Sequence, residues 1–175
     1  MGAMRGSPTN RGTAGDDVRE VLDAIRRLVR TLRLSAREAE QEVGLSGAQL
    51  FVLQSLGKDD EPTLGALAER TSTDPSSVSV VVARLVARGL VRRKKDPDDA
   101  RRLRLSLTAH GRALVRRAPH AAQERLVEAL QGLPAAKRRT LAGLLDGVAA
   151  KMGISGSEAP MMFDEEPEPR VRRAR

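Results

Sequence analysis

The chain has 175 residues, of which 40% are hydrophobic, and a formal net charge of +8. This length allows one domain with its own core, or one protomer of an intertwined dimer. Cysteine is absent from the sequence, which excludes disulfides, thiolate metal sites and cysteine-based redox sensing in this chain. Tryptophan and tyrosine are absent as well, which argues against a stacking platform for single-stranded nucleic acid.

The first segment, residues 1–15, is rich in Gly, Ser and Pro and has no apolar periodicity, so we expect a flexible leader. The sequence contains no run of about 18 apolar residues, the length expected of a membrane span. No signal-peptide pattern precedes Asp16. These features together predict a cytoplasmic protein that does not contact a membrane.

A long amphipathic helix is predicted from residue 16 to about Val43, within a segment, 16–45, that we assign to dimerisation. Apolar residues recur there at steps of three and four, at Val18, Val21, Leu22, Ile25, Leu28, Val29 and Leu32. At 1.5 Å per residue such a helix is roughly 40 Å long. Because a rod of this length outreaches a small core, we favour packing against a partner's helices, with folding back onto its own domain as the alternative.

A second helix is predicted to begin after Ser46, because Gln49 three residues later completes a capping box. Gly57 and the polar residues that follow it close this helix. Its expected buried residues are apolar and follow one another closely: Leu50, Phe51, Leu53 and Leu56.

Two further short helices follow and together predict a helix-turn-helix unit. Thr63 is the expected N-cap of the first. Asp74 is a strong N-cap for the second, and Pro75 occupies the first helical position, where its missing N–H costs nothing. Gly89 is expected to end the second helix, which makes 75–88 the candidate recognition helix.

A basic β-hairpin is predicted after Gly89, where LVRRKK and RLRLSLT flank the turn sequence DPDDA. Leu103, Leu105 and Leu107 share one face of the second arm, and Arg102, Arg104 and Ser106 share the other. Residues 84–117 contain twelve basic and three acidic residues, a net charge of +9. Charge gathered on one surface can neutralise several phosphates together, although a solvated face of an arginine-rich chain remains the alternative.

The C-terminal part predicts helices followed by a tail. Thr108 is the expected cap of a helix reaching about Leu130, and Pro119 predicts a kink or break near Arg117. After Pro134 another helix carries an apolar stripe, expected to be buried, at Leu141, Leu144, Leu145, Val148 and Met152. We assign 109–153 to dimerisation helices and expect 154–175 to be a disordered tail.

The order of these elements, with the sequence DPDDARRLRLSLTAHGRAL, resembles the MarR family of bacterial transcription regulators over about residues 18–152. The most specific part is Asp99-x-Arg101 followed by LSLTAHGRAL. The resemblance implies a mainly α-helical winged helix-turn-helix lobe at 46–108, a small antiparallel β-wing, and N- and C-terminal dimerisation helices. It also implies a homodimeric repressor of a pseudo-palindromic operator, released by a small molecule bound between the dimerisation helices and this lobe, and no enzyme.

Candidate DNA contacts follow from the helix and from the wing. Ser76, Ser77, Ser79 and Val80 are expected near base edges, with Arg84 reaching phosphate or base. Arg92, Lys94, Lys95 and Arg102 are candidate phosphate contacts, with solvent exposure alone as the alternative, and Arg101 is suited to the minor groove. Asp99 is expected to brace the wing by pairing with Arg93. We expect Val78, Val81 and Val82 in the core, whereas Val80 fits the core or the surface equally well.

Direct readout of bases is the weaker part of this interpretation, because Val80 stands where the family commonly has a longer polar side chain. A sequence-tolerant architectural DNA-binding protein therefore stays an alternative, as does a protein-interaction module with a basic surface. His110 and His120 have no carboxylate or thiol at metal-ligand spacing, so neither a metal nor a cofactor is expected. The sequence also lacks a phosphate-binding glycine loop and a nucleophile elbow.

Overall fold

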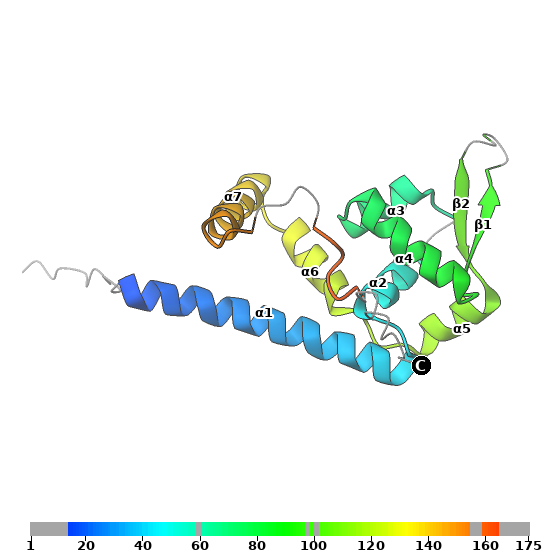
Figure 1. Ribbon diagram of the computed structural model, residues 1–175, viewed down its shortest axis with the longest axis horizontal. Helices are drawn as coiled ribbons and strands as arrows, with labels where there is room; N and C mark the ends of the chain where they lie inside the picture. The colour runs from blue at the N-terminus through cyan, green and yellow to red at the C-terminus, as the bar shows by residue number, and fades with distance from the viewer. Residues whose placement is uncertain (1–13, 59–60, 97–98, 100–101, 155–158, 165–175) are drawn as a thin grey trace, which may run out of the picture.

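The computed structural model describes residues 14–58, 61–96, 99, 102–154 and 159–164 (Figure 1). Over these residues it is mainly α-helical with one small β-sheet. The elements in chain order are α1 (Ala14–Val43), α2 (Gly47–Leu56), α3 (Leu64–Thr71), α4 (Pro75–Ala87), β1 (Val91–Lys95), β2 (Leu103–Leu107), α5 (Ala109–Arg117), α6 (Ala122–Gln131) and α7 (Ala135–Lys151). The predicted fold class is confirmed.

Helix α2 is the centre of the lobe. Nine of its ten residues are buried, and it contacts α1, α3, α4, α5, α6 and β2. A mainly apolar helix that is buried on all sides needs a core around it, and the neighbouring elements supply that core. The capping box is present as predicted: the Ser46 hydroxyl accepts from the Gln49 N–H at 3.2 Å, and the Gln49 side chain accepts from the Ser46 N–H at 3.3 Å.

The helix-turn-helix unit consists of α3 and α4. The Thr63 hydroxyl accepts from the Ala66 N–H, and the Asp74 carboxylate accepts from the Ser76 N–H, which confirms both predicted caps. Ser72 ends α3 in the left-handed conformation, with φ 51°, and so turns the chain sharply toward α4. Gly89 follows α4 with φ 68° and confirms the predicted stop.

The wing is an antiparallel β1–β2 hairpin in which Arg93 pairs with Leu105 and Lys95 pairs with Leu103. A third segment supports it, because the Leu105 N–H donates to the Pro62 carbonyl at 2.9 Å and Thr63 forms a bridge with Arg104. The hairpin is therefore tied to the start of α3 as well as to α4. Leu105 and Leu107 are buried, whereas Leu103, near the tip, is exposed.

Beyond the wing, the break predicted at Pro119 is confirmed. Helix α5 ends at Arg117 and α6 begins at Ala122, and the intervening backbone is held by Gln54, whose side chain bonds the Pro119 carbonyl and the Ala121 N–H. The start of α5 packs tightly on the residues before β1: the Thr108 N–H donates to the Leu90 carbonyl at 3.0 Å. Gly111 lies against the same carbonyl.

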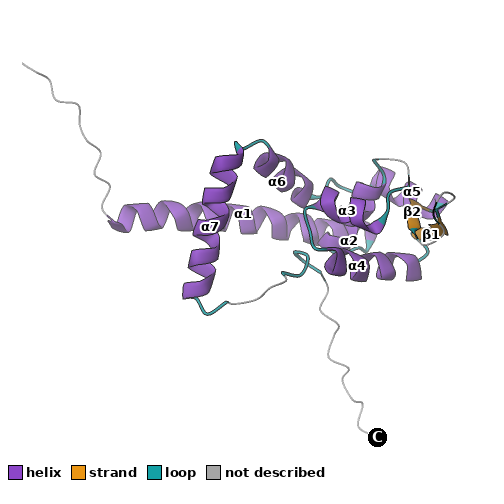
Figure 2. Cartoon of the chain, turned by 90° about the horizontal axis from the view of Figure 1, so that it is seen from above, coloured by secondary structure: helices purple, strands orange, loops and turns teal. Residues whose placement is uncertain are grey.

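The outer helices carry apolar residues that the single chain does not bury. On α1 the exposed ones are Val18, Val21, Leu22, Ile25, Leu28, Val29 and Leu34, and on α7 and its C-cap they are Leu141, Leu144, Leu145, Val148 and Met152. The stripe on α7 was expected to be buried, and within one chain it is not. Figure 2 shows why: α1 extends away from the lobe and α7 runs across its direction, so neither packs along the other.

The prediction of disorder beyond Ile154 is wrong for residues 159–164. Met161 is only 6% exposed and belongs to the main hydrophobic cluster. In Figure 1 this segment, coloured orange to red, runs beside α6 toward α2. Its apolar run is only three residues long, at Met161, Met162 and Phe163, which is too short for periodicity to reveal.

Gly111 offers a direct test of this packing. A Cβ atom there would collide with the Leu90 carbonyl oxygen, which belongs to rigid backbone. We expect Gly111→Ala to lower the free energy of unfolding by about 1–3 kcal/mol, the usual cost of overpacking. The control is Gly65→Ala on α3, where a Cβ meets nothing within 4 Å. It should be neutral or stabilising. Urea titrations followed by circular dichroism at equal protein concentration would measure both, and equal effects would contradict this packing.

Candidate nucleic-acid interface

The exposed face of α4 is the first part of the candidate interface. Val78, Val81 and Val82 are completely buried, as expected, whereas Val80 is 47% exposed. Ser76, Val80 and Arg84 follow one another at four-residue intervals and therefore share one side of the helix. Ser77 and Ser79 are half-buried at its margins.

Asp74 holds the N-terminus of α4 and also engages the first serine of this face. The Ser76 hydroxyl donates to Asp74 Oδ1 at 2.6 Å, and the Ser76 N–H donates to the same oxygen at 2.7 Å. These hydrogen bonds, the side-chain one foremost, lower the pKa of Asp74 below its ordinary 3.8. The ionised cap thus contributes stability at neutral pH, and the contribution is lost as the pH falls through the lowered value.

Arg84, expected to contact phosphate or base, is engaged within the chain. Its guanidinium forms an ion pair with the carboxylate of Asp164, from the C-terminal segment. The two side chains are 30% and 18% exposed, so the pair is largely shielded from water. Sequence reasoning missed this contact because the partners lie 80 residues apart.

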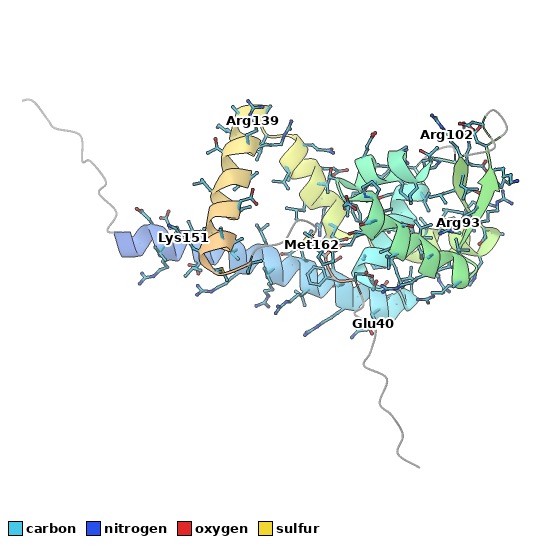
Figure 3. All side chains as sticks on the ribbon, turned by 45° about the horizontal axis from the view of Figure 1, so that its top comes forward. Glu40, Arg93, Arg102, Arg139, Lys151 and Met162 are labelled. Atoms are coloured by element: carbon cyan, nitrogen blue, oxygen red, sulfur yellow. The ribbon has the colours of Figure 1, made fainter. Side chains whose placement is uncertain are left out.

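The wing carries the basic residues that were predicted to contact phosphate. Of these, Lys95 is exposed on β1. Arg102 is exposed just before β2, and Arg93, which was predicted as a brace, is also exposed on β1 (Figure 3). Arg92 and Lys94 both approach Glu61, at 3.8 and 3.6 Å from its Oε1. Arg101, the candidate for the minor groove, lies outside the described residues.

The expected brace between Asp99 and Arg93 is corrected by the geometry. Asp99 instead approaches Arg102, with Arg102 Nε 3.3 Å from Asp99 Oδ2, while the Arg102 N–H donates to the Asp99 carbonyl at 2.8 Å. Asp99 lies in the turn, Arg102 lies just after it, and Arg93 lies in the middle of β1. Arg102 is therefore the nearer arginine, and Asp99 pairs with it.

A second acidic residue, missed from the sequence, anchors the base of the turn. Asp96 is 6% exposed and accepts from Arg104 Nε at 2.8 Å. The Asp96 N–H donates to the Arg102 carbonyl at 2.9 Å, which closes the hairpin beyond the last strand pair. The alternation of Arg104 with leucines indicated an outward side chain but could not reveal a buried carboxylate beside it.

Two clefts flank the C-terminal segment. One, of about 440 Å³, lies between α1 and the start of α2 and includes Arg33, Arg37 and Glu40 together with Phe163 and Asp164. The other, of about 360 Å³, lies between the α3–α4 turn, α6 and residues 159–162. The first corresponds to part of the effector cleft expected from the sequence, between the long N-terminal helix and the lobe.

Other kinds of site are absent from the described part of the chain. It holds no cluster of His, Asp or Glu able to bind a metal ion. His110 and His120 are both exposed. None of its helices combines the length and the apolar character needed to cross a membrane.

Comparison with known proteins decides what this arrangement is. A model of the MarR family matches residues 43–102. A helix-turn-helix transcriptional regulator of Mycobacterium leprae is 39% identical over 123 residues, which cover 70% of this chain and 83% of that protein. The chain belongs to the MarR family. It is a transcription regulator with a DNA-binding winged helix, and not an enzyme.

Two further similar proteins are a transcriptional repressor and a protein with regulated DNA binding. The transcriptional repressor MdtR of Bacillus subtilis is 38% identical over 74 residues, which cover 42% of this chain and 48% of that protein. The structure of BpsR of Bordetella bronchiseptica, whose DNA binding is regulated by 6-hydroxynicotinic acid, matches with a TM-score of 0.51 and 28% identity. That match covers 74% of this chain and 98% of BpsR.

The wing of this MarR-family protein yields a test in which charge and geometry predict opposite results. Asp96→Ala removes a negative charge, which alone would strengthen attraction to DNA. We expect weaker duplex binding instead, by about tenfold or ~1.4 kcal/mol, because Arg104 loses its partner and the hairpin its anchor. Asp99→Ala should weaken binding less, because Asp99 is more exposed than Asp96.

The control for this test is Asp17→Ala, which removes the same charge from the first turn of α1. Fluorescence anisotropy with a labelled duplex would measure all three variants, with circular dichroism confirming that each is folded. Binding by Asp96→Ala that equals or exceeds binding by the control would contradict a bracing role.

Proposed function

We propose that this MarR-family regulator is a homodimeric repressor that binds a pseudo-palindromic operator and is released by a small molecule. The observation that carries the proposal is the combination of a capped recognition helix, a basic wing beside it, and two apolar helix faces that one chain leaves uncovered. For binding to such an operator, the helix would contact bases, the wing would contact phosphates, and the apolar faces would join two copies in a symmetric dimer.

The dimer is supported by the exposed residues of α1 and α7. Soluble monomers rarely leave a continuous apolar face of this kind in water. Val18, Val21, Leu22 and Ile25 follow one another on α1, and Leu144, Val148 and the C-cap residue Met152 do so along α7. A second copy, which carries the same two faces, can cover both in a two-fold arrangement.

DNA binding is supported by the position of the charge. The exposed Arg93, Lys95 and Arg102 belong to one hairpin, and α4 lies next to it in the same lobe. In a winged helix this arrangement lets the helix enter a major groove while the wing follows the neighbouring phosphates. Two lobes in a dimer would then read half-sites about one helical turn apart.

Release by a ligand is supported by the cleft of about 440 Å³ between α1 and α2. Two arginines, Arg33 and Arg37, and two carboxylates, Glu40 and Asp164, line it, so the cleft offers partners for acidic and for basic groups of a ligand. In the similar protein BpsR, DNA binding is regulated by a small molecule, 6-hydroxynicotinic acid. Repression as the output is supported by the similarity to MdtR.

The dimer can be tested at α7. We expect Leu144→Asp to shift the protein toward monomer and to weaken duplex binding, because a charge in an apolar interface is costly to bury. The control is Ala150→Asp, which places the same charge outside the stripe, on an exposed residue. Sedimentation velocity at several concentrations would measure the oligomeric state. Identical behaviour of the two variants would contradict the role assigned to this face.

The operator can be tested by selecting bound duplexes from a random pool. We expect two inverted half-sites with centres about 10 base pairs apart, the spacing of two major grooves on one side of the duplex. A salt titration on the selected and a scrambled duplex then measures specificity. A specificity ratio near one would favour the architectural alternative, and no duplex binding at low salt would favour a protein-interaction module.

A further inference from the structure

We propose that residues 160–164 form an autoinhibitory latch, which fills part of the space between α1, α2 and α6 and withholds Arg84 from DNA. The proposal rests on the function proposed above, because it concerns how DNA binding is controlled. It adds a regulatory element from this chain's own C-terminal segment.

The latch is attached to the lobe by burial and by hydrogen bonds. Met161 enters the main hydrophobic cluster, and Gln123 Nε2 donates to the Met162 carbonyl at 2.6 Å. Figure 3 shows Met162 where α6 approaches the lobe. The Asp164 N–H donates to the Met161 carbonyl at 3.2 Å, which folds the segment into a turn.

The start of α2 accommodates the latch closely. A Cβ on Gly47 would lie 3.0 Å from the Ala36 Cβ and 3.3 Å from the Phe163 Cβ. The Ala48 N–H, one of the free donors at the N-terminus of α2, points to the Phe163 carbonyl at 3.5 Å. Phe163 itself has φ 59°, an unfavourable conformation for a residue with a side chain.

Some interactions therefore stabilise the latch in its docked position on the lobe, and others oppose it. The φ of Phe163 costs free energy, and so does the side-chain oxygen of Gln123, which is buried and accepts no hydrogen bond from the described residues. A segment with such costs can be displaced by a competitor, which a switch requires and a permanent part of the core does not.

The competitor is the DNA itself. Arg84 lies one turn beyond the exposed Val80, on the same side of α4 as Ser76, and Asp164 holds its guanidinium. The Asp164 carboxylate also sets a negative charge beside the helix face that must approach phosphates. Release of the latch therefore frees one cation and removes one repulsive charge together.

The first test measures duplex affinity. We expect Asp164→Asn to bind about tenfold more tightly at low salt, and its plot of log affinity against log salt to steepen by about 0.9, the value for one more neutralised phosphate. Arg84→Ala should change binding little in the otherwise native chain but abolish the gain in the Asp164→Asn background. The matched control is Glu42→Gln, at an exposed carboxylate of α1, which also removes one negative charge.

The second test follows the latch without relying on DNA affinity. The sequence contains no tryptophan, so Phe163→Trp introduces a single fluorophore, and the adjacent cleft of about 440 Å³ has room for it. We expect the indole to be shielded from acrylamide in the free protein. It should become more quenchable when Asp164→Asn is added or when the protein is saturated with duplex.

The outcomes separate the latch from the function on which it rests. Failure of every variant to bind duplex would refute the proposed function. The docking of the latch would still be tested in that case, by comparing acrylamide quenching of Phe163→Trp with and without Asp164→Asn. The latch is overturned if Asp164→Asn binds duplex no more tightly than Glu42→Gln. It is equally overturned if neither Asp164→Asn nor saturating duplex changes the quenching.

Discussion

Burial of α2 on every side is the constraint on which the rest of the structure depends. It is contacted by helices α1, α3, α4, α5 and α6 and by strand β2. The candidate recognition helix, the wing and the long N-terminal helix are therefore all packed against the same buried helix. Displacement of α1 or α6 against α2 therefore reaches α4 through packed side chains, which transmit a shift because a dense core cannot absorb it. The clefts that flank residues 159–164 lie at these same junctions.

The interface shows how little a count of charges says about DNA contacts. Among the basic residues of the predicted stretch, Arg84 pairs with Asp164, Arg104 with Asp96, and Arg92 and Lys94 share Glu61. Part of the positive charge thus stabilises the lobe. Exposed pairs such as those of Glu61 are weak and can exchange for phosphate, whereas the buried carboxylate of Asp96 holds its arginine in place. Arg93 and Lys95, which are exposed and form no ion pair with another described residue, and Arg102, which is paired only at the surface, are the better candidates for phosphate contact.

Local features of the fold could be predicted from the sequence, and distant contacts could not. Ser46, Thr63, Asp74 and Thr108 cap helices as predicted, because a cap depends on residues within three positions. The partner of Asp99 was predicted wrongly, since the course of a turn decides which arginine comes close. The contact between Arg84 and Asp164 depends on the path of the whole chain, and the composition of the C-terminal segment suggested disorder.

Sequence specificity is limited by what α4 exposes. The Ser76 hydroxyl already donates to Asp74, and Val80 offers only an apolar surface, suited to a thymine methyl group. Arg84 is then the longest polar side chain of this line of residues, and it is the one that Asp164 holds. Control of Arg84 would change specificity as well as affinity, because the other contacts proposed for this interface come from the wing and would be made mostly to phosphates, which are the same at every site.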